Sequence, residues 1–240
     1  MGSSVDINAD IGEGFGRWQL GDDAGLLAVI SSANVACGFH AGDPTIMRHT
    51  CHLAADLGVT VGAQVSYPDL AGFGRRFIDI DPLELIDAVL YQVGALERLA
   101  IVEGTSVRYV KPHGALYNAI VHHGAQATAV VEALVAHGGG LPLLGLAGSV
   151  VEQAATAAGL PFVREGFADR AYTSSGALVP RTERGALLTD VGRVVTQACR
   201  LADSGVRSIC VHGDTPGATS LAAAVHDALV SAGHLVVPFA

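Results

Sequence analysis

Short runs rich in β-branched residues alternate with longer Ala- and Leu-rich segments along the whole chain. This alternation is typical of βα units arranged around a parallel sheet. We expect strands over residues 5–9, 33–36, 59–63, 107–110, 142–146, 162–164 and 208–211, with a last short one at 235–237. The predicted helices cover residues 22–31, 44–57, 82–103, 115–136, 149–158, 189–204 and 216–232. Seven or eight such repeats favour an α/β fold that closes into a distorted barrel over an open sheet.

The length of the chain fits one barrel. It has 240 residues, and single (β/α) barrels of about 250 residues are routine. We therefore expect residues 1–240 to form a single (β/α) barrel domain. Residues 64–81 and 165–184 contain glycines and no helical period, so they are predicted to be long loops over one end of the barrel.

The charge and cysteine content exclude several classes of partner. The formal net charge of −9 gives nucleic acid and anionic membrane surfaces no broad attraction. No apolar run approaches the roughly 20 residues that span a bilayer, and we expect a cytoplasmic protein. The 4 cysteines show no C-x-x-C spacing, which predicts free thiols.

Polar residues follow the predicted strands at their C-terminal ends, where barrel enzymes place their sites. The candidates, in chain order, are Asn8, Asp10, His40, Gln64, Lys111, His113, Glu165, Asp169, Arg170, His212 and Asp214. Asn8 and Asp10 project to the same side of one strand because side chains alternate with period two. Repetition of such residues after six strands predicts a functional rim at one end of the barrel.

Lys111 is the only lysine, because 13 of the 14 basic residues are arginine. A compact ammonium group cannot be replaced by a planar guanidinium at a tight polar site. The survival of this one lysine within Val110-Lys111-Pro112-His113-Gly114 therefore indicates a functional role.

The motifs constrain how a metal or nucleotide could bind. Three rim histidines with Asp10 and Asp214 could hold a divalent ion, but no ligand pair at a fixed local spacing supports this, so we assign no metal ligand. Neither a Walker pattern nor a G-x-G-x-x-G after a strand is present. If ATP binds, Lys111, Arg170, Arg181 and the Arg75-Arg76 pair are the available phosphate partners. The absence of a G-x-S-x-G elbow argues against a serine hydrolase.

Several long segments resemble the signature segments of one family. They are DINADIGEG (residues 6–14), SANVACGFHAGD (32–43), RYVKPHGALYN (108–118), FADR (167–170), LVPR (178–181) and VHGD (211–214). The chain resembles the LamB/YcsF family, which supplies the A-type subunit of the bacterial ATP-dependent 5-oxoprolinase. The segments occur in order over nearly the whole chain.

The resemblance implies a seven-stranded (β/α) barrel of the glycoside hydrolase and deacetylase type. It implies that ATP-dependent hydrolysis of 5-oxo-L-proline gives L-glutamate, with ADP and phosphate as the other products. ATP would be a cofactor, and magnesium is a second candidate cofactor. Subunits B and C would be partners, and the resemblance leaves open whether the chain also forms a homo-oligomer.

We assign roles to the rim residues on this basis. Lys111 and Arg170 would bind phosphoryl oxygens, and Asp10 or His113 would activate water. His40, His212 and Asp214 would orient the lactam, whereas Glu165 and Asp169 would protonate the leaving nitrogen or hold magnesium. Asn8, Gln64 and Arg181 complete the predicted substrate- or ATP-binding set. Gln64-Val65 stands where some members of the family carry His-Pro, and an amide cannot act as a general base.

Two alternatives stay open. The related barrels and the His/Asp-rich rim would also suit a metal-dependent deacetylase or carbohydrate hydrolase, which would lose activity to a chelator and need no ATP. The chain could instead be a non-catalytic lactam-binding subunit, in which case Asp10→Ala would leave the assembled complex active.

Overall fold

Seven parallel strands form a closed barrel in this computed structural model, which describes residues 4–174, 176–213 and 217–240. The strands are β1 (Ser4–Ile11), β2 (Ser32–Ala36), β3 (Thr60–Val65), β4 (Val107–Pro112), β5 (Leu143–Leu146), β6 (Phe162–Phe167) and β7 (Ser208–Cys210). Each strand pairs with the next, and β1 pairs with both β7 and β2, which closes the barrel. The short β8 (Leu235–Val236) adds to the start of β1. The predicted seven-stranded α/β barrel is confirmed.

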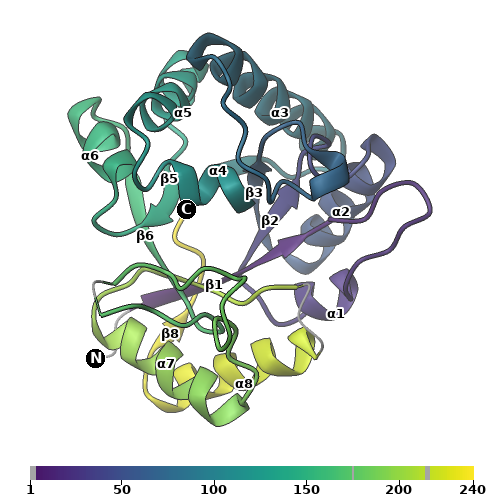
Figure 1. The fold of residues 1–240 in the computed structure, drawn as a ribbon. Helices are drawn as coiled ribbons and strands as arrows, with labels where there is room; N and C mark the ends of the chain where they lie inside the picture. Colours follow the sequence, from purple (N-terminus) through teal and green to yellow (C-terminus); the bar gives the residue numbers. More distant parts are fainter. Residues whose placement is uncertain (1–3, 175, 214–216) are drawn as a thin grey trace.

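Helices connect the strands and surround the barrel (Figure 1). They are α1 (Asp23–Leu27), α2 (Pro44–Leu57), α3 (Pro82–Val102), α4 (Gly114–Ala119), α5 (Gly124–His137), α6 (Val150–Ala157), α7 (Val191–Asp203) and α8 (Ala218–Ser231). Helix α2 shows how the sequence sets the bounds. The Asp43 carboxylate accepts the backbone N–H of Thr45, Pro44 occupies the first turn, and Gly58 ends the helix with φ 69°.

Two predicted helices differ from the observed ones. The helix expected over 115–136 is divided into α4 and α5, because the chain turns after Ile120 and the His123 side chain caps a new helix at the Gln126 N–H. The helix expected over 22–31 is only the five residues of α1, since the chain enters β2 at Ser32.

Strand β1 places polar side chains inside the barrel and apolar side chains in the layer between the barrel and the surrounding helices. On β1, Ile7, Ala9 and Ile11 pack in the hydrophobic core, whereas Asp6, Asn8 and Asp10 point the other way and contact polar side chains of other strands. Period-two alternation therefore lines the barrel with hydrogen-bonding groups from one strand.

A glycine makes room for a tyrosine ring inside the barrel. A Cβ on Gly62 of β3 would lie 2.2 Å from the ring of Tyr109 on β4. Tyr109 is fully buried and donates a hydrogen bond to Asn34 Oδ1 at 2.6 Å. The absent side chain at position 62 thus allows the Tyr109 ring to fill the barrel beneath the rim.

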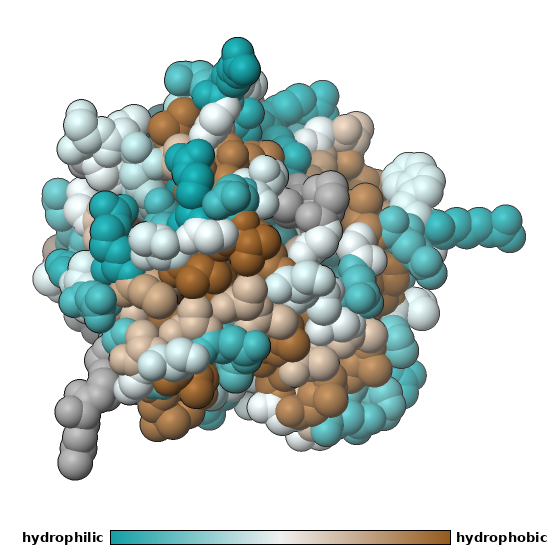
Figure 2. All heavy atoms as spheres, turned by 90° about the horizontal axis from the view of Figure 1, so that it is seen from below, coloured by the Kyte–Doolittle hydropathy of each residue, from teal (hydrophilic) through white to brown (hydrophobic). Residues whose placement is uncertain are grey.

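The segments predicted as loops lie between strands and helices, although β6 extends to Phe167 and a short 3₁₀ helix, η1 (Leu70–Gly72), lies in the first loop. On the face seen from below α7 and α8, apolar side chains are interspersed with polar ones (Figure 2). Within the described ranges, no helix combines the length and apolarity needed to cross a bilayer.

Candidate active site at the C-terminal rim of the barrel

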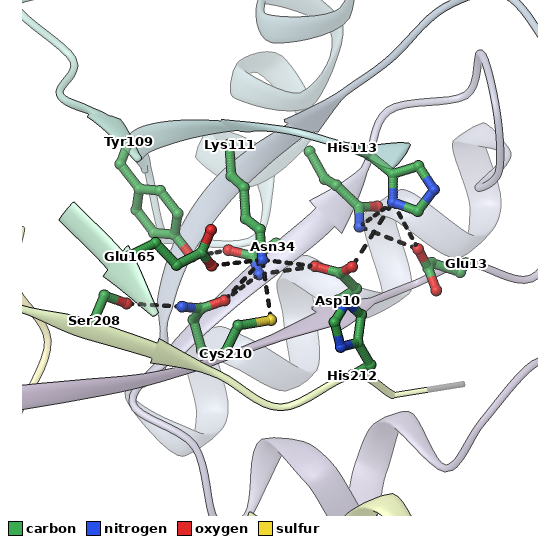
Figure 3. A network of polar contacts seen from close by, with 12 residues as sticks. Asp10, Glu13, Asn34, Tyr109, Lys111, His113, Glu165, Ser208, Cys210 and His212 are labelled. Carbon is green, nitrogen blue, oxygen red and sulfur yellow. Dashed lines mark hydrogen bonds and ion pairs between the residues drawn. The ribbon is translucent and has the colours of Figure 1, made fainter. Parts of the chain in front are cut away.

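A cavity of about 690 Å³ opens at the C-terminal ends of the strands. Asp10 from β1, Lys111 from β4 and the residues that follow β4 and β7, His113 and His212, contribute to its wall (Figure 3). Parallel strands bring their carboxyl ends to one rim, so residues far apart in sequence meet there.

The Lys111 ammonium group lies below the cavity between two carboxylates. Its Nζ is 2.8 Å from Glu165 Oε1 and 3.3 Å from Asp10 Oδ1, and it donates a hydrogen bond to Asn8 Oδ1 at 3.0 Å (Figure 3). Burial favours the neutral amine, but Asp10 and then Cys210 and Glu165 outweigh it and raise the pKa of Lys111 well above its usual value. Lys111 is therefore a fixed cation and not a nucleophilic amine.

Asp10 is the ionised carboxylate of the cavity floor. Its Oδ1 accepts a hydrogen bond from Asn34 Nδ2 at 3.0 Å. Burial alone would raise the pKa of Asp10, but the charge of Lys111 lowers it well below its usual value. A carboxylate held in this way can orient a water molecule or a polar substrate group in the cavity.

Asp169 and His212 form a second pair. His212 Nδ1 lies 2.8 Å from Asp169 Oδ1, and the backbone N–H of His212 donates to Asp169 Oδ2 at 3.1 Å. Burial raises the pKa of Asp169, but His212 outweighs it and the net direction is down, so the carboxylate is an acceptor. Nδ1 of His212 must then carry the proton, which leaves the Nε2 lone pair of a cavity residue available for proton transfer.

His113 and Gln64 belong to a third network. The Gln64 amide lies 3.0 Å from Glu13 Oε1, from His113 Nδ1 and from His40 Nε2. The rings of His40 and His113 stack with centroids 4.2 Å apart. Glu13, His40 and His113 each offer one ligand atom within 4.8 Å of the others, so this buried group could hold a metal ion.

Arginine side chains line the outer part of the cavity. Arg75, Arg170 and Arg181 contribute to its wall. Arg170 is 5% exposed, and its Nη2 donates to the carbonyl oxygen of Val179 at 2.7 Å. Its buried Nε has no hydrogen-bond partner among the described residues, which leaves one donor for an anionic ligand.

The predicted site residues fall into three groups. Six line the cavity, namely Asp10, Lys111, His113, Arg170, Arg181 and His212. Five are buried behind its wall and contact the first six or one another, namely Asn8, His40, Gln64, Glu165 and Asp169. Asp214 lies outside the described residues.

Several residues that the structure places in the site are not among those predicted from the sequence. Glu13 was part of the first signature segment, yet the sequence carried no sign that it meets His113. Inside the barrel, Asn34 contacts Asp10, and Tyr109 in turn contacts Asn34. Cys210 contacts Lys111. The signal that could have found Tyr109 and Cys210 is alternation, because each precedes a predicted site residue by two positions along the chain.

Comparison with known proteins identifies the family of the chain. Residues 5–240 match the LamB/YcsF family. The chain belongs to this family. It is 57% identical to the A-type subunit of the 5-oxoprolinase of Kocuria rhizophila, a match that covers 98% of this chain and 99% of that protein.

Solved structures show the same fold. The crystal structure of the lactam utilization protein from Thermus thermophilus has a TM-score of 0.93 and 40% identity, covering 98% of this chain and 100% of that one. A family 4 carbohydrate esterase from Streptomyces lividans has a TM-score of 0.52 and 13% identity, with 99% and 93% covered. The second likeness concerns the barrel alone.

Proposed function

We propose that the chain is the A-type subunit of an ATP-dependent 5-oxoprolinase and that its rim cavity is where 5-oxo-L-proline is opened to L-glutamate. One observation carries the proposal. The fixed Lys111 cation and the ionised Asp10 meet at the floor of a cavity whose wall holds Arg170 and Arg181. Membership of the LamB/YcsF family and the relatives that serve as A-type subunits of 5-oxoprolinase support it.

The chemistry requires activation of a stable amide. Transfer of the γ-phosphoryl group of ATP to the lactam oxygen, with loss of the amide proton, gives an imidate phosphate and ADP. Water adds to C5, the ring C–N bond breaks, and both protons of this water pass to the nitrogen, which leaves γ-glutamyl phosphate with a free amine. A second water molecule hydrolyses this acyl phosphate to L-glutamate and phosphate.

Five residues of the cavity wall, with Asp169 behind it, have a part in these steps. Arg170 and Arg181 bind phosphoryl oxygens, and Lys111 stabilises negative charge on the lactam oxygen. His212 takes the proton of the attacking water at Nε2 and returns it to the ring nitrogen, while Asp169 holds the imidazole in place. Asp10 orients the water.

The buried residues and the partners complete the proposal. Glu165 and Asn8 hold Lys111 in place, and Gln64 and His40 support His113. Magnesium accompanies ATP as its counter-ion, and subunits B and C complete the enzyme.

Glutamate release from 5-oxo-L-proline and ATP tests the proposal. We expect release by the wild-type chain mixed with subunits B and C, a loss of at least roughly a hundredfold in Asp10→Ala, and no loss in Asp56→Ala on the exposed end of α2. No glutamate under any condition would contradict the 5-oxoprolinase function. Full activity of Asp10→Ala in the mixture would favour a non-catalytic lactam-binding role.

A further inference from the structure

The group of Glu13, His40 and His113 lies beside the catalytic cavity and has no part in the proposed reaction. Their exposed fractions are 6%, 0% and 6%, and Glu13 and His113 line the cavity. They follow three different strands, β1, β2 and β4. One carboxylate oxygen and two imidazole nitrogens therefore converge in a buried place that opens to the substrate side.

The protonation of His113 follows from one backbone contact. Its Nε2 lies 3.1 Å from the carbonyl oxygen of Phe73, which can only accept, so Nε2 carries the proton. The lone pair of the neutral ring is then on Nδ1, which lies 3.4 Å from Glu13 Oε1. A histidine that binds a metal usually has its outer nitrogen donating to such a carbonyl group.

The orientation of the Gln64 amide follows in turn. Its nitrogen lies 3.0 Å from both Glu13 Oε1 and His113 Nδ1, two acceptors, so the NH₂ group must face them. Its oxygen accepts from His40 Nε2, and the buried Nδ1 of His40 has no hydrogen-bond partner among the described residues. The NH₂ group of Gln64, the positive end of the amide dipole, thus occupies the place between Glu13 Oε1 and His113 Nδ1 where a cation could bind.

We propose that Glu13, His40 and His113 form a divalent transition-metal site, and that the Gln64 amide moves aside when the ion binds. Two imidazoles and one carboxylate suit Zn²⁺ or a similar ion better than Mg²⁺, which prefers oxygen ligands. Asp10 Oδ2 lies 3.7 Å from His113 Nδ1, so the ion would face the same cavity as Asp10.

The sequence assigned no metal ligand, because it holds no ligand pair at a fixed local spacing, whereas we propose three ligands here. No local spacing connects the three residues, because the loops after three strands deliver them. The inference stands on this geometry and does not depend on the 5-oxoprolinase function, since the ion can be detected without any assay of activity.

Metal binding by the isolated chain tests the site. After treatment with a chelator and gel filtration, calorimetry with Zn²⁺ and elemental analysis should show one equivalent bound by the wild type. Glu13→Gln should lower the affinity at least about tenfold. Gln64→Ala should bind at least as tightly as the wild type, because the amide competes with the ion. Binding lost in Gln64→Ala but retained in Glu13→Gln would overturn the site.

A surface variant controls for adventitious binding. His52 lies on the exposed face of α2, 3.3 Å from Glu103 and 3.5 Å from Asp56, so this cluster is a rival surface site. His52→Asn should retain the bound equivalent. Zn²⁺ binding that disappears in His52→Asn, or the absence of stoichiometric Zn²⁺ from the wild type, overturns the proposal. Substitution of Co²⁺ into the wild type supplies a visible spectrum that reports nitrogen ligands without any variant that could misfold.

Discussion

At the scale of single residues, Lys111 of the cavity floor also contributes to the stability of the fold. Removing the ammonium group leaves Asp10 and Glu165 buried without their cation, and breaking a buried pair in this way costs about 3–5 kcal/mol. We expect Lys111→Met to lower the free energy of unfolding by that amount in urea titrations. The double variant Lys111→Met/Glu165→Gln should lose less than the sum of the single losses, because one unpaired carboxylate is removed with the cation. Additive losses would contradict the coupling.

Asp169 sets the tautomer of His212. In Asp169→Asn the amide NH₂ can donate to His212 Nδ1, which would move the ring proton to Nε2 and remove the lone pair from the cavity. We expect the turnover number of the assembled enzyme to fall by roughly 10²–10⁴-fold with little change in KM. Nitrogen-15 NMR of the isolated chain should show the exchanged tautomer.

The tautomer measurement separates this role from a structural one. If Asp169→Asn keeps the proton on Nδ1 and still loses activity, the carboxylate acts otherwise than by positioning His212. Asp190→Asn provides a matched control, because Asp190 caps α7 at the Arg193 N–H, away from the cavity wall.

At the scale of elements, the inward face of β1 makes stability depend on pH. Asp6 is fully buried, and burial raises its pKa to about 6. Hydrogen bonds donated by the hydroxyl groups of Ser31, Ser32 and Ser208 lower the pKa but do not outweigh burial. The folded protein then holds the proton while the unfolded chain, with a pKa near 3.8, has released it. The stabilising contribution of Asp6 is therefore complete below about pH 4 and lost as the pH rises to about 6.

Asp6→Asn tests this dependence. A shift of about 2 pKa units corresponds to at most roughly 3 kcal/mol of unfolding free energy. Urea titrations between pH 4 and pH 6 should show a smaller decline for Asp6→Asn than for the wild type. Asp227→Asn, on the exposed face of α8, should retain the wild-type decline. Equal declines in all three proteins would mean that other groups, such as Asp23, account for the effect.

The same scale shows what the sequence could predict. Strand periods and glycine stops indicated the order of elements, and because parallel strands end at one rim they also indicated Asp10, Lys111, His113 and His212. The division between α4 and α5 was missed, although His122, His123 and Gly124 interrupt the run of apolar residues after Ile120. Pairings across the barrel were also hidden, as for Asp169 and His212, which are 43 residues apart. The contact between Glu13 and Gln64 depends on where a loop and a strand meet, which no local pattern encodes.

At the scale of the whole molecule, the arginines of the cavity wall oppose the net charge of the protein. The chain carries a formal net charge of −9, whereas Arg75, Arg170 and Arg181 line the cavity in which we propose that an anionic lactam and ATP bind. Burial and the nearby Arg181 lower the pKa of Arg170, so the two guanidinium groups repel each other. These arginines thus form a positive part of the cavity wall, beside the acidic Asp10 and Glu13, and can attract an anionic substrate across a negative surface.

Such attraction weakens when salt screens it, since the Debye length falls to about 10 Å at 0.1 M. We expect kcat/KM of the assembled enzyme to decrease as the ionic strength rises. Arg181→Ala should lower kcat/KM about tenfold at low salt and should make kcat/KM depend less steeply on ionic strength. Arg193→Ala, on the exposed part of α7, should keep the wild-type slope. If both variants show the wild-type slope, entry of substrate is not steered by the arginines of the cavity, and Arg181 acts only after binding or not at all.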